Sequence, residues 1–363
     1  MQLVEGTLPT DVRADRARHL DECASCRRAV GSLVRLLSTE ENPALARTIA
    51  SERPPAPAAP HPDVASGSRE KTPGGLGFLA GDVVGRYQLE RVLGEGGLGV
   101  VWAARHMLTR KVVALKFTKF DHPELMKRFL REARVGGVLR HRAVVEVHDV
   151  FESHAGGPLV MVMDLLHGES LDQLLARRQR IPAIEAMFLL QPVLSALASA
   201  HALGIVHRDI KPPNIFLEQG EGGPFGRLLD FGLARLTATE GAAAMTSVLT
   251  REKQLMGTPH YMAPEQLYGE IDIDLRTDVW AMGVVFYECL TGRRPLEGGS
   301  VGQILRSLAT TEIAPIANVV PEVPTELARA IDASLVRDRA ARLPSVLPLL
   351  AIAERALGMP PTL

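Results

Sequence analysis

The stretch that decides the fold runs from Val206 to Phe216 and reads Val-His-Arg-Asp-Ile-Lys-Pro-Pro-Asn-Ile-Phe, followed at 228–232 by Leu-Leu-Asp-Phe-Gly. It places carboxylate, ammonium and amide side chains close together in the chain: Asp209, Lys211, Asn214 and Asp230. Such a set suits the transfer of a phosphoryl group between oxygens. One carboxylate accepts the proton of an attacking hydroxyl, while the other carboxylate and the amide hold Mg²⁺ against the phosphates.

A glycine-rich stretch lies upstream of these residues. Gly94, Gly96 and Gly99 have the spacing Gly-x-Gly-x-x-Gly, which dinucleotide-binding folds also use. A dinucleotide loop opens a helix, whereas here a strand pattern continues at 100–104 and recurs at 112–117. The pattern therefore predicts a hairpin whose glycine tip lies over phosphates, because no Cβ atom blocks the backbone amides.

Lys116 lies in an otherwise apolar strand, so it needs an anionic partner. The amphipathic helix predicted at 123–139 offers Glu132. The rival on this helix is Glu124, which sits in the first turn, where an acidic residue suits the helix dipole. We therefore predict an ion pair between Lys116 and Glu132.

Together these motifs resemble the protein kinase superfamily. The segment Gly-Thr-Pro-His-Tyr-Met-Ala-Pro-Glu at 257–265 resembles the substrate-docking segment of the same family. The resemblance covers residues 87–357 and implies an α+β, bilobal protein-kinase fold within residues 85–358. The antiparallel-sheet N-lobe is expected at 85–164 and the mostly helical C-lobe at 168–358.

The resemblance also implies MgATP as the phosphoryl donor and gives roles to particular residues. Asp209 would orient the attacking hydroxyl, and Lys211, two residues later, is typical of the serine/threonine class in bacterial, eukaryotic-like kinases. Met163 would be the gatekeeper, and Asn214 and Asp230 would bind Mg²⁺. The residues implied to hold the nucleotide are Gly94, Gly96, Gly99, Val101, Ala114, Lys116, Glu132, Met163, Asp164, Leu166, Asn214 and Asp230.

The segment between Asp230 and Glu265 resembles a kinase activation segment. It contains a cluster of hydroxyl side chains: Thr246, Ser247 and Thr250. Thr250 is the first choice for autophosphorylation, and Arg208 would bind the resulting phosphate through its fork of N–H donors. The alternative is that these are ordinary loop hydroxyls.

Two carboxylates are expected to have structural roles. Glu265 would be buried, with Arg342 as its partner, because a buried unpaired carboxylate is costly. Asp278 opens an apolar helix predicted at 278–290 and would accept hydrogen bonds from the backbone of the catalytic loop.

Residues 1–50 are predicted to form a separate small helical module. His19, Cys23 and Cys26 are spaced i, i+4, i+7, which places an imidazole and two thiols on one helix face as part of a Zn²⁺ site. The motif resembles the zinc-binding domain of bacterial anti-sigma factors, but that family has a fourth ligand upstream, and here no His or Cys precedes His19. A zinc site completed by a carboxylate or water, and a purely structural role for both cysteines, stay open.

The rest of the composition is ordinary. Residues 51–84 are rich in Pro and Ala and predict an extended linker. The net charge of −1 predicts no attraction to nucleic acid or anionic lipid. The most apolar stretch, 181–206, is interrupted by polar residues and fits a buried helix better than a membrane span. The 3 cysteines form no disulfide framework, and a cytoplasmic location is expected.

The predicted function is that of a serine/threonine protein kinase that acts on protein substrates and on itself in signal transduction. The alternative is a pseudokinase or metal-responsive scaffold that binds nucleotide, and a regulatory protein at the N-terminal module, without catalysis. This alternative depends on that unusual module and on Gly136, at a position where many kinases carry a larger apolar residue.

Overall fold

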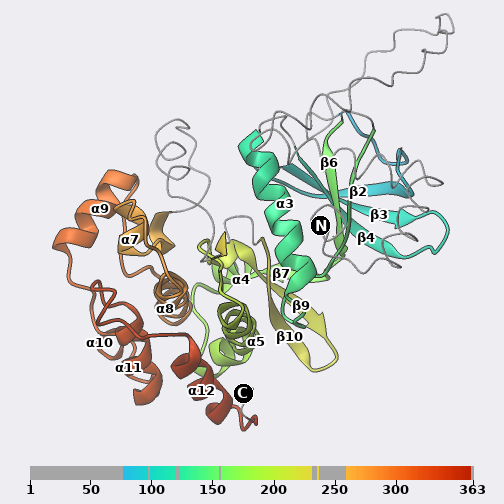
Figure 1. The fold of residues 1–363 in the computed structure, drawn as a ribbon. Coiled ribbons are helices and arrows are strands. Elements are labelled where there is room, and N and C mark those ends of the chain that lie inside the picture. Colours follow the sequence, from blue (N-terminus) through green and yellow to red (C-terminus); the bar gives the residue numbers. More distant parts are fainter. Residues whose placement is uncertain are drawn as a thin grey trace, which may run out of the picture. The chain divides into compact units, whose positions relative to one another are not determined.

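The computed structural model describes residues 77–96, 99–118, 123–154, 157–230, 235–236 and 259–360. These residues form an antiparallel sheet region, the N-lobe, and a mostly helical region, the C-lobe (Figure 1). The two regions have separate hydrophobic cores. The predicted α+β, bilobal fold is confirmed.

The N-lobe is built on a six-stranded antiparallel sheet with the order β1-β2-β3-β4-β6-β5. Alternate residues of β4, such as Leu115 and Phe117, are fully buried in the core on one face of the sheet. Its strands are β1 (Val83–Val84), β2 (Tyr87–Gly96), β3 (Gly99–His106), β4 (Val112–Thr118), β5 (Val147–Glu152) and β6 (Leu159–Asp164).

The N-lobe begins earlier than its predicted start at residue 85. Val84 pairs with Tyr87 across the β1–β2 turn, and the ring of Phe78 lies 5.0 Å from that of Phe117. Residues 78–84 were predicted to be the end of the linker, because a two-residue strand is too short to show an alternating pattern. Their packing on the sheet places them in the N-lobe.

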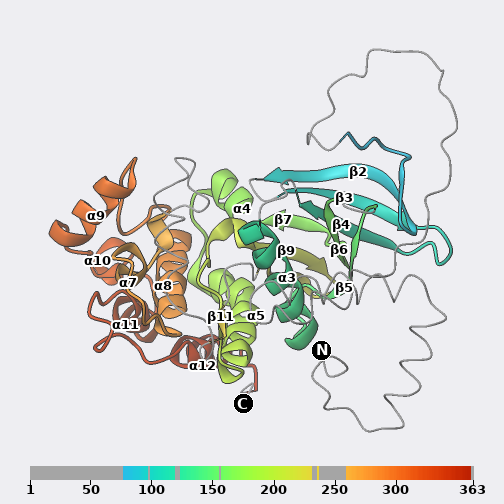
Figure 2. The same ribbon diagram turned by 45° about the horizontal axis from the view of Figure 1, so that its top comes forward.

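Helix α3 (Pro123–Val138) accompanies the sheet and lies on its C-lobe side in Figures 1 and 2. Phe129 and Val135 are buried on its apolar face, as the amphipathic pattern predicts. At Gly136 the helix approaches β5 so closely that a Cβ atom would lie 2.6 Å from Cγ2 of Val147. The glycine therefore has a packing reason within the N-lobe.

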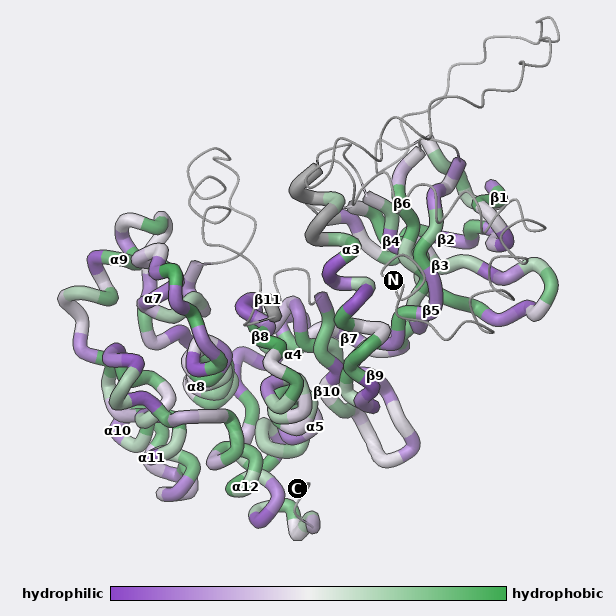
Figure 3. Tube along the Cα trace, in the orientation of Figure 1, coloured by the Kyte–Doolittle hydropathy of each residue, from purple (hydrophilic) through white to green (hydrophobic). Residues whose placement is uncertain are grey.

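The C-lobe is organised around two helices that are apolar on nearly all sides, α5 and α8 (Figure 3). Helix α8 ends at Gly292, whose φ of 73° is left-handed, as glycine allows. The C-lobe helices are α4 (Leu171–Arg178), α5 (Ala183–Ala202), α7 (Pro264–Leu267), α8 (Arg276–Thr291), α9 (Val301–Thr310), α10 (Ile316–Val319), α11 (Thr325–Ser334) and α12 (Leu347–Ala356).

Helix α5 is long and apolar enough to cross a membrane by length and composition alone. However, 67% of its apolar window is buried inside the protein. It packs against α8, α12 and the strand β10 (Gly223–Leu228). The prediction of a buried core helix is confirmed.

Short strands and 3₁₀ turns connect the C-lobe helices and carry the loops of the site. Two of these strands, β9 and β10, pair as an antiparallel hairpin. The strands are β7 (Gly168–Ser170), β8 (Ile205–Val206), β9 (Ile215–Gly220), β10 (Gly223–Leu228) and β11 (Arg235–Leu236), and the turns are η2 (Pro212–Asn214) and η4 (Pro259–Tyr261).

Candidate active site

The predicted catalytic loop, residues 207–214, gathers three polar side chains. The Lys211 ammonium lies 2.9 Å from both carboxylate oxygens of Asp209. The amide nitrogen of Asn214 donates to the Asp209 backbone carbonyl at 2.7 Å and to its carboxylate at 3.0 Å. The turn η2, in which two prolines fix φ, brings Asn214 back toward Asp209. Two donors thus hold the Asp209 carboxylate in one orientation.

Asp278, in the first turn of α8, anchors this loop from inside the C-lobe. Its carboxylate accepts hydrogen bonds of 2.8 Å from the backbone N–H groups of His207 and Arg208. It also lies 2.8 Å from Nε2 of His201. Burial raises the pKa of this carboxyl, but the hydrogen bonds and nearby histidines outweigh burial, and the net pKa is lowered. The predicted contact of Asp278 with the catalytic loop is confirmed.

Lys116 of β4 joins carboxylates from two other parts of the chain. Its ammonium lies 2.8 Å from Oε1 of Glu132, on α3, and 2.5 Å from Oδ1 of Asp230. The first contact confirms the predicted ion pair, whereas the second was not predicted. Lys116 and Glu132 are buried, but 42% of the Asp230 side chain is exposed. Asp230 is therefore the carboxylate of this group that a ligand can reach from solvent.

Burial and mutual attraction set the charges of this group. Burial lowers the pKa of Lys116, but attraction to Asp230 and Glu132 outweighs it and raises the net pKa. Partial removal of Asp230 from water also raises its pKa, but attraction to Lys116 and hydrogen bonds leave that pKa lowered, to about 2. For Glu132 burial dominates, and the pKa is raised. At neutral pH Lys116 is thus an ammonium and Asp230 a carboxylate.

Backbone contacts connect Asp230 to the catalytic loop. The N–H of Leu229 donates to the Asn214 carbonyl at 2.8 Å, and Nε2 of His207 lies 3.0 Å from the Leu229 carbonyl. Asp230 itself has a φ of 57°, in the left-handed region that residues other than glycine seldom adopt. These contacts hold the strained residue Asp230 beside Asn214. The catalytic loop therefore adjoins the Lys116 group, which consists of Lys116, Glu132 and Asp230.

The strand register brings further predicted site residues to the face of the sheet that carries Lys116. Val101 lies opposite Lys116 in the β3–β4 pair, and Met163 lies opposite Ala114 in the β4–β6 pair. Because side chains alternate along a strand, Val101, Ala114 and Met163 share this face, whereas Leu115 turns to the core on the other side.

The glycines of the β2–β3 hairpin differ in what they make room for. Gly96 pairs with Gly99 across the tip, whose residues 97–98 lie outside the described part of the chain. A Cβ atom at Gly99 would lie 1.8 Å from the carbonyl oxygen of Phe117, so β4 itself requires glycine there. A Cβ atom at Gly94 would contact nothing within 4 Å.

Comparison with known families decides what this arrangement is. Residues 87–348 match the family described as protein kinase domain, which is well over half of the chain. The chain belongs to the protein kinase family. The match runs from β2 into α12 and therefore includes every element that positions the side chains of the site.

The kinase is similar to several bacterial proteins. Serine/threonine-protein kinase pkn3 of Myxococcus xanthus is 35% identical over 72% of this chain and 49% of its own length. Serine/threonine-protein kinase PknA of Mycobacterium tuberculosis is 35% identical over 71% of this chain and 58% of its own length. The chain thus spans about half the length of these curated relatives.

The connector between the kinase lobes, residues 163–168, contains a polar cluster that sequence reasoning missed. The Asp164 carboxylate lies 2.8 Å from Nε2 of His148 in the N-lobe and 3.4 Å from the guanidinium of Arg227 in β10. Arg227 also donates to the Val144 carbonyl at 2.7 Å and to Glu218 at 2.9 Å. The side chain of Asp164 thereby joins both lobes. No local pattern could show this, because the partners are far apart in the chain.

Part of the connector backbone already makes hydrogen bonds within the protein. The Asp164 N–H donates to the Glu146 carbonyl at 3.1 Å, and the residue predicted to act with it, Leu166, is half-buried. The resemblance implies that Asp164 and Leu166 help to hold the nucleotide, and this role stays a prediction.

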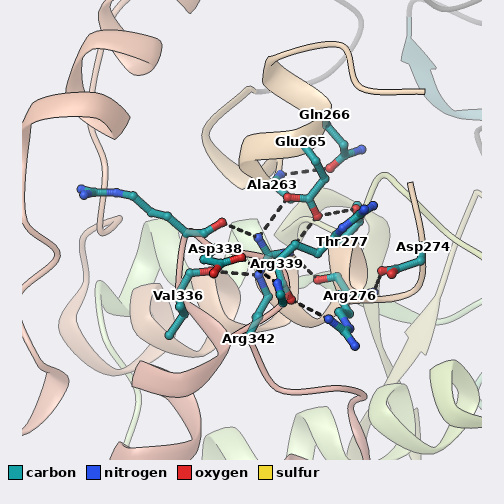
Figure 4. Close-up of polar contacts among 12 residues, drawn as sticks. Ala263, Glu265, Gln266, Asp274, Arg276, Thr277, Val336, Asp338, Arg339 and Arg342 are labelled. Carbon is teal, nitrogen blue, oxygen red and sulfur yellow. Dashed lines mark hydrogen bonds and ion pairs between the residues drawn. The ribbon is translucent and has the colours of Figure 1, made fainter. Parts of the chain in front are cut away.

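The end of the predicted docking segment is fixed by a buried ion pair (Figure 4). The Arg342 guanidinium donates to both carboxylate oxygens of Glu265, at 2.7 and 3.0 Å, which confirms the predicted pairing. Thr277 donates to the same carboxylate at 2.9 Å, and the guanidinium of Arg342 lies 5.2 Å from the centre of the Trp280 ring. Burial raises the pKa of Glu265, but these donors outweigh it, and the net pKa is lowered.

Several predicted residues lie outside the part of the chain that the structure describes. They are the hydroxyl cluster Thr246, Ser247 and Thr250 and the ligand set His19, Cys23 and Cys26. The side chain of Glu124 also lies outside it. The guanidinium of Arg208, the predicted phosphate partner, donates to the Ile273 carbonyl at 3.0 Å.

Proposed function

We propose that this kinase transfers the γ-phosphoryl group of ATP to serine and threonine hydroxyls of proteins, its own included. One observation carries the proposal. The oriented carboxylate of Asp209 lies in a loop that hydrogen-bonds to Leu229, and the next residue, Asp230, contacts the buried ammonium of Lys116. Phosphoryl transfer needs this combination of an acceptor for the hydroxyl proton and fixed cationic charge.

Asp209 would orient the attacking hydroxyl and take its proton. Lys211, at 2.9 Å from both oxygens, fixes the carboxylate and adds positive charge where the transferred group would pass. Asn214 holds the same carboxylate from another side. The contribution of this loop is therefore positioning and charge neutralisation.

The donor chemistry of Asn214 and Asp230 fits Mg²⁺, which prefers carboxylate and amide oxygens. The nitrogen of the Asn214 amide is committed to Asp209, so its oxygen is the atom left for a metal. Asp230 presents a partly exposed carboxylate that stays ionised at neutral pH. When bound, Mg²⁺ neutralises and orients the phosphate oxygens.

Lys116 would hold the α- and β-phosphates. Its raised pKa keeps it charged, and Glu132 fixes its direction from α3. Its contact with Asp230 competes with phosphate for the same ammonium. Binding of nucleotide would therefore exchange one anionic partner of Lys116 for another. Val101, Ala114, Met163 and the connector would enclose the base.

Serine and threonine are the proposed acceptors because of Lys211 and because the similar proteins are named serine/threonine-protein kinases. Protein substrates and a cytoplasmic location are part of the same proposal. Thr250, with Thr246 and Ser247 behind it, is the proposed site of autophosphorylation, and Arg208 its proposed phosphate partner.

Incubation of the purified chain with MgATP labelled at the γ-phosphate tests this function. We expect label on Ser and Thr of an added basic protein and on the activation segment, located by peptide mapping. Bound nucleotide without any label would instead establish a scaffold, and label on Tyr alone would refute the serine/threonine class. Label confined to residues other than Thr246, Ser247 and Thr250 would refute the proposed autophosphorylation sites.

For the N-terminal module we propose a Zn²⁺ site at His19, Cys23 and Cys26, used to engage a regulatory protein. The support is the spacing of one imidazole and two thiols. The expected result is one Zn²⁺ per chain by elemental analysis, lost in Cys23→Ser but kept in the control Cys289→Ser, whose thiol is buried in the C-lobe. A wild-type chain purified in zinc-containing buffer without bound metal would end this proposal.

A further inference from the structure

The residue before Asp209 has a strained backbone. Arg208 has a backbone φ of 69°, which residues other than glycine seldom adopt, and its side chain is buried. Such a conformation persists only where the surroundings hold it. The groups that hold Arg208 therefore also set where the Asp209 carboxylate points.

Two side chains hold the two backbone groups of Arg208. The Asp278 carboxylate accepts its N–H at 2.8 Å, as described above. The Arg208 carbonyl accepts a hydrogen bond of 2.9 Å from Nε2 of Gln266, a side chain in α7 that is only 5% exposed. Asp278 belongs to the central helix of the C-lobe, whereas Gln266 belongs to α7, the short helix that begins at the end of the docking segment. The catalytic loop is thus clamped between two different elements.

The other end of the Gln266 amide is also used. Its Oε1 accepts the backbone N–H of Ala263 at 3.0 Å, at the start of the same short helix (Figure 4). The neighbouring Glu265 is fixed by Arg342. Helix α7 is therefore held by Glu265 on one side and holds the catalytic loop through Gln266 on the other. The amide of Gln266 thus supplies both the acceptor and the donor that this position uses.

We propose that Gln266 is a positioning residue that transmits the placement of the docking segment to Asp209 through the Arg208 carbonyl. The inference rests on the proposed kinase function, which gives Asp209 its role. It means that the segment that would seat the protein substrate also sets the angle of the carboxylate that would receive the substrate proton.

Gln266→Glu is the decisive variant, because it keeps an acceptor for Ala263 but turns a carboxylate oxygen, which cannot donate, toward the Arg208 carbonyl. Gln266→Met removes both. Gln191→Met is the matched control, since Gln191 is an equally buried glutamine in α5 that faces Glu354 at 3.5 Å. Each protein is measured for kcat, for the KM of ATP, and for hydrogen exchange of the amides at 206–210.

We expect both Gln266 variants to lower kcat about tenfold and to speed exchange at 206–210 about tenfold, as loss of one buried hydrogen bond implies. The KM of ATP is expected to stay within about twofold, because the Lys116 group is untouched. Gln191→Met is expected to match the wild type in kcat and in exchange at 206–210.

Wild-type exchange at 206–210 in Gln266→Glu would overturn the inference. An effect in Gln266→Met alone would also overturn it, because it would assign the effect to the Ala263 bond. A wild-type protein without kinase activity would remove the proposed function, yet the exchange measurement would still decide whether Gln266 holds the loop. Uniformly faster exchange across α5, α7 and α8 would reveal general destabilisation and count against a positioning role.

Discussion

Asp209→Asn is expected to reduce turnover by about 10²- to 10⁴-fold, the usual contribution of a positioned proton acceptor. The amide cannot take the proton of the attacking hydroxyl. It would also turn an N–H₂ group toward donors, because Lys211 lies 2.9 Å from both oxygens and Asn214 lies 3.0 Å from one. The measurement is the initial rate of γ-phosphate transfer, with ATP affinity determined separately by calorimetry.

ATP affinity should stay within a few-fold, because Lys116 and Asp230 are unchanged. Asp272→Asn is the control: its side chain is 96% exposed, and its rate should equal that of the wild type. Equal labelling of the wild type and Asp209→Asn would show that Asp209 is not the proton acceptor. The label would then be assigned to a contaminating kinase, and the pseudokinase alternative would be favoured.

Arg342→Met is expected to destabilise the folded kinase by about 3–5 kcal/mol, because it leaves the buried Glu265 carboxylate without its cation. The same change removes hydrogen bonds of 2.9 and 3.0 Å from the guanidinium to the carbonyls of Arg276 and Val336. The midpoint of thermal unfolding should fall by about 10 °C. Chemical unfolding followed by tryptophan fluorescence measures the free energy directly.

The matched control is Arg355→Met. Arg355 pairs with Glu326 at 2.7 Å, but both side chains are more than half exposed, at 60% and 69%. Surface pairs of this kind contribute about 0–1 kcal/mol. An equal loss of stability in the two variants would contradict the argument that burial makes the Glu265 pair important.

The penalty in Arg342→Met should also depend on pH. In the wild type the folded pKa of Glu265 is lowered, so its stabilisation is present above the unfolded pKa and is lost as pH falls through the folded pKa. In the variant, burial without a partner raises the folded pKa, so protonation relieves the strain as pH falls. The stability difference between the two proteins should therefore shrink in acid, and a constant difference would refute this account.

The clustering of Asp209, Lys211 and Asn214 was predictable from the sequence, because they lie within six positions of one another. The chemistry that we propose for them limits which residue types can share that stretch. The Lys116–Glu132 pair was predictable for another reason: a charge in an apolar strand needs a partner, and the next helix offered a single well-placed carboxylate.

The rest depended on how distant segments meet. The contact of Lys116 with Asp230 joins residues 114 positions apart, and whether they touch is set by the packing of the two lobes. Arg227 and Gln266 are isolated polar residues with no periodic pattern around them. Their roles follow only from the folded structure, in which Arg227 donates to the Val144 carbonyl and Gln266 donates to the Arg208 carbonyl. The glycine spacing also did not show that β4 itself requires glycine at Gly99, where an added Cβ atom would lie 1.8 Å from the Phe117 carbonyl oxygen.

Arg208 and Asp230, the two left-handed residues of the site, oppose the local preferences of the chain with φ values of 69° and 57°. Part of the free energy of the C-lobe core is therefore used to keep them there. Selection for thermal stability alone would favour substitutions that allow Arg208 and Asp230 to adopt an unstrained φ. Selection for turnover would instead keep the left-handed conformation. If the proposed function holds, stability and turnover place opposite demands on this loop.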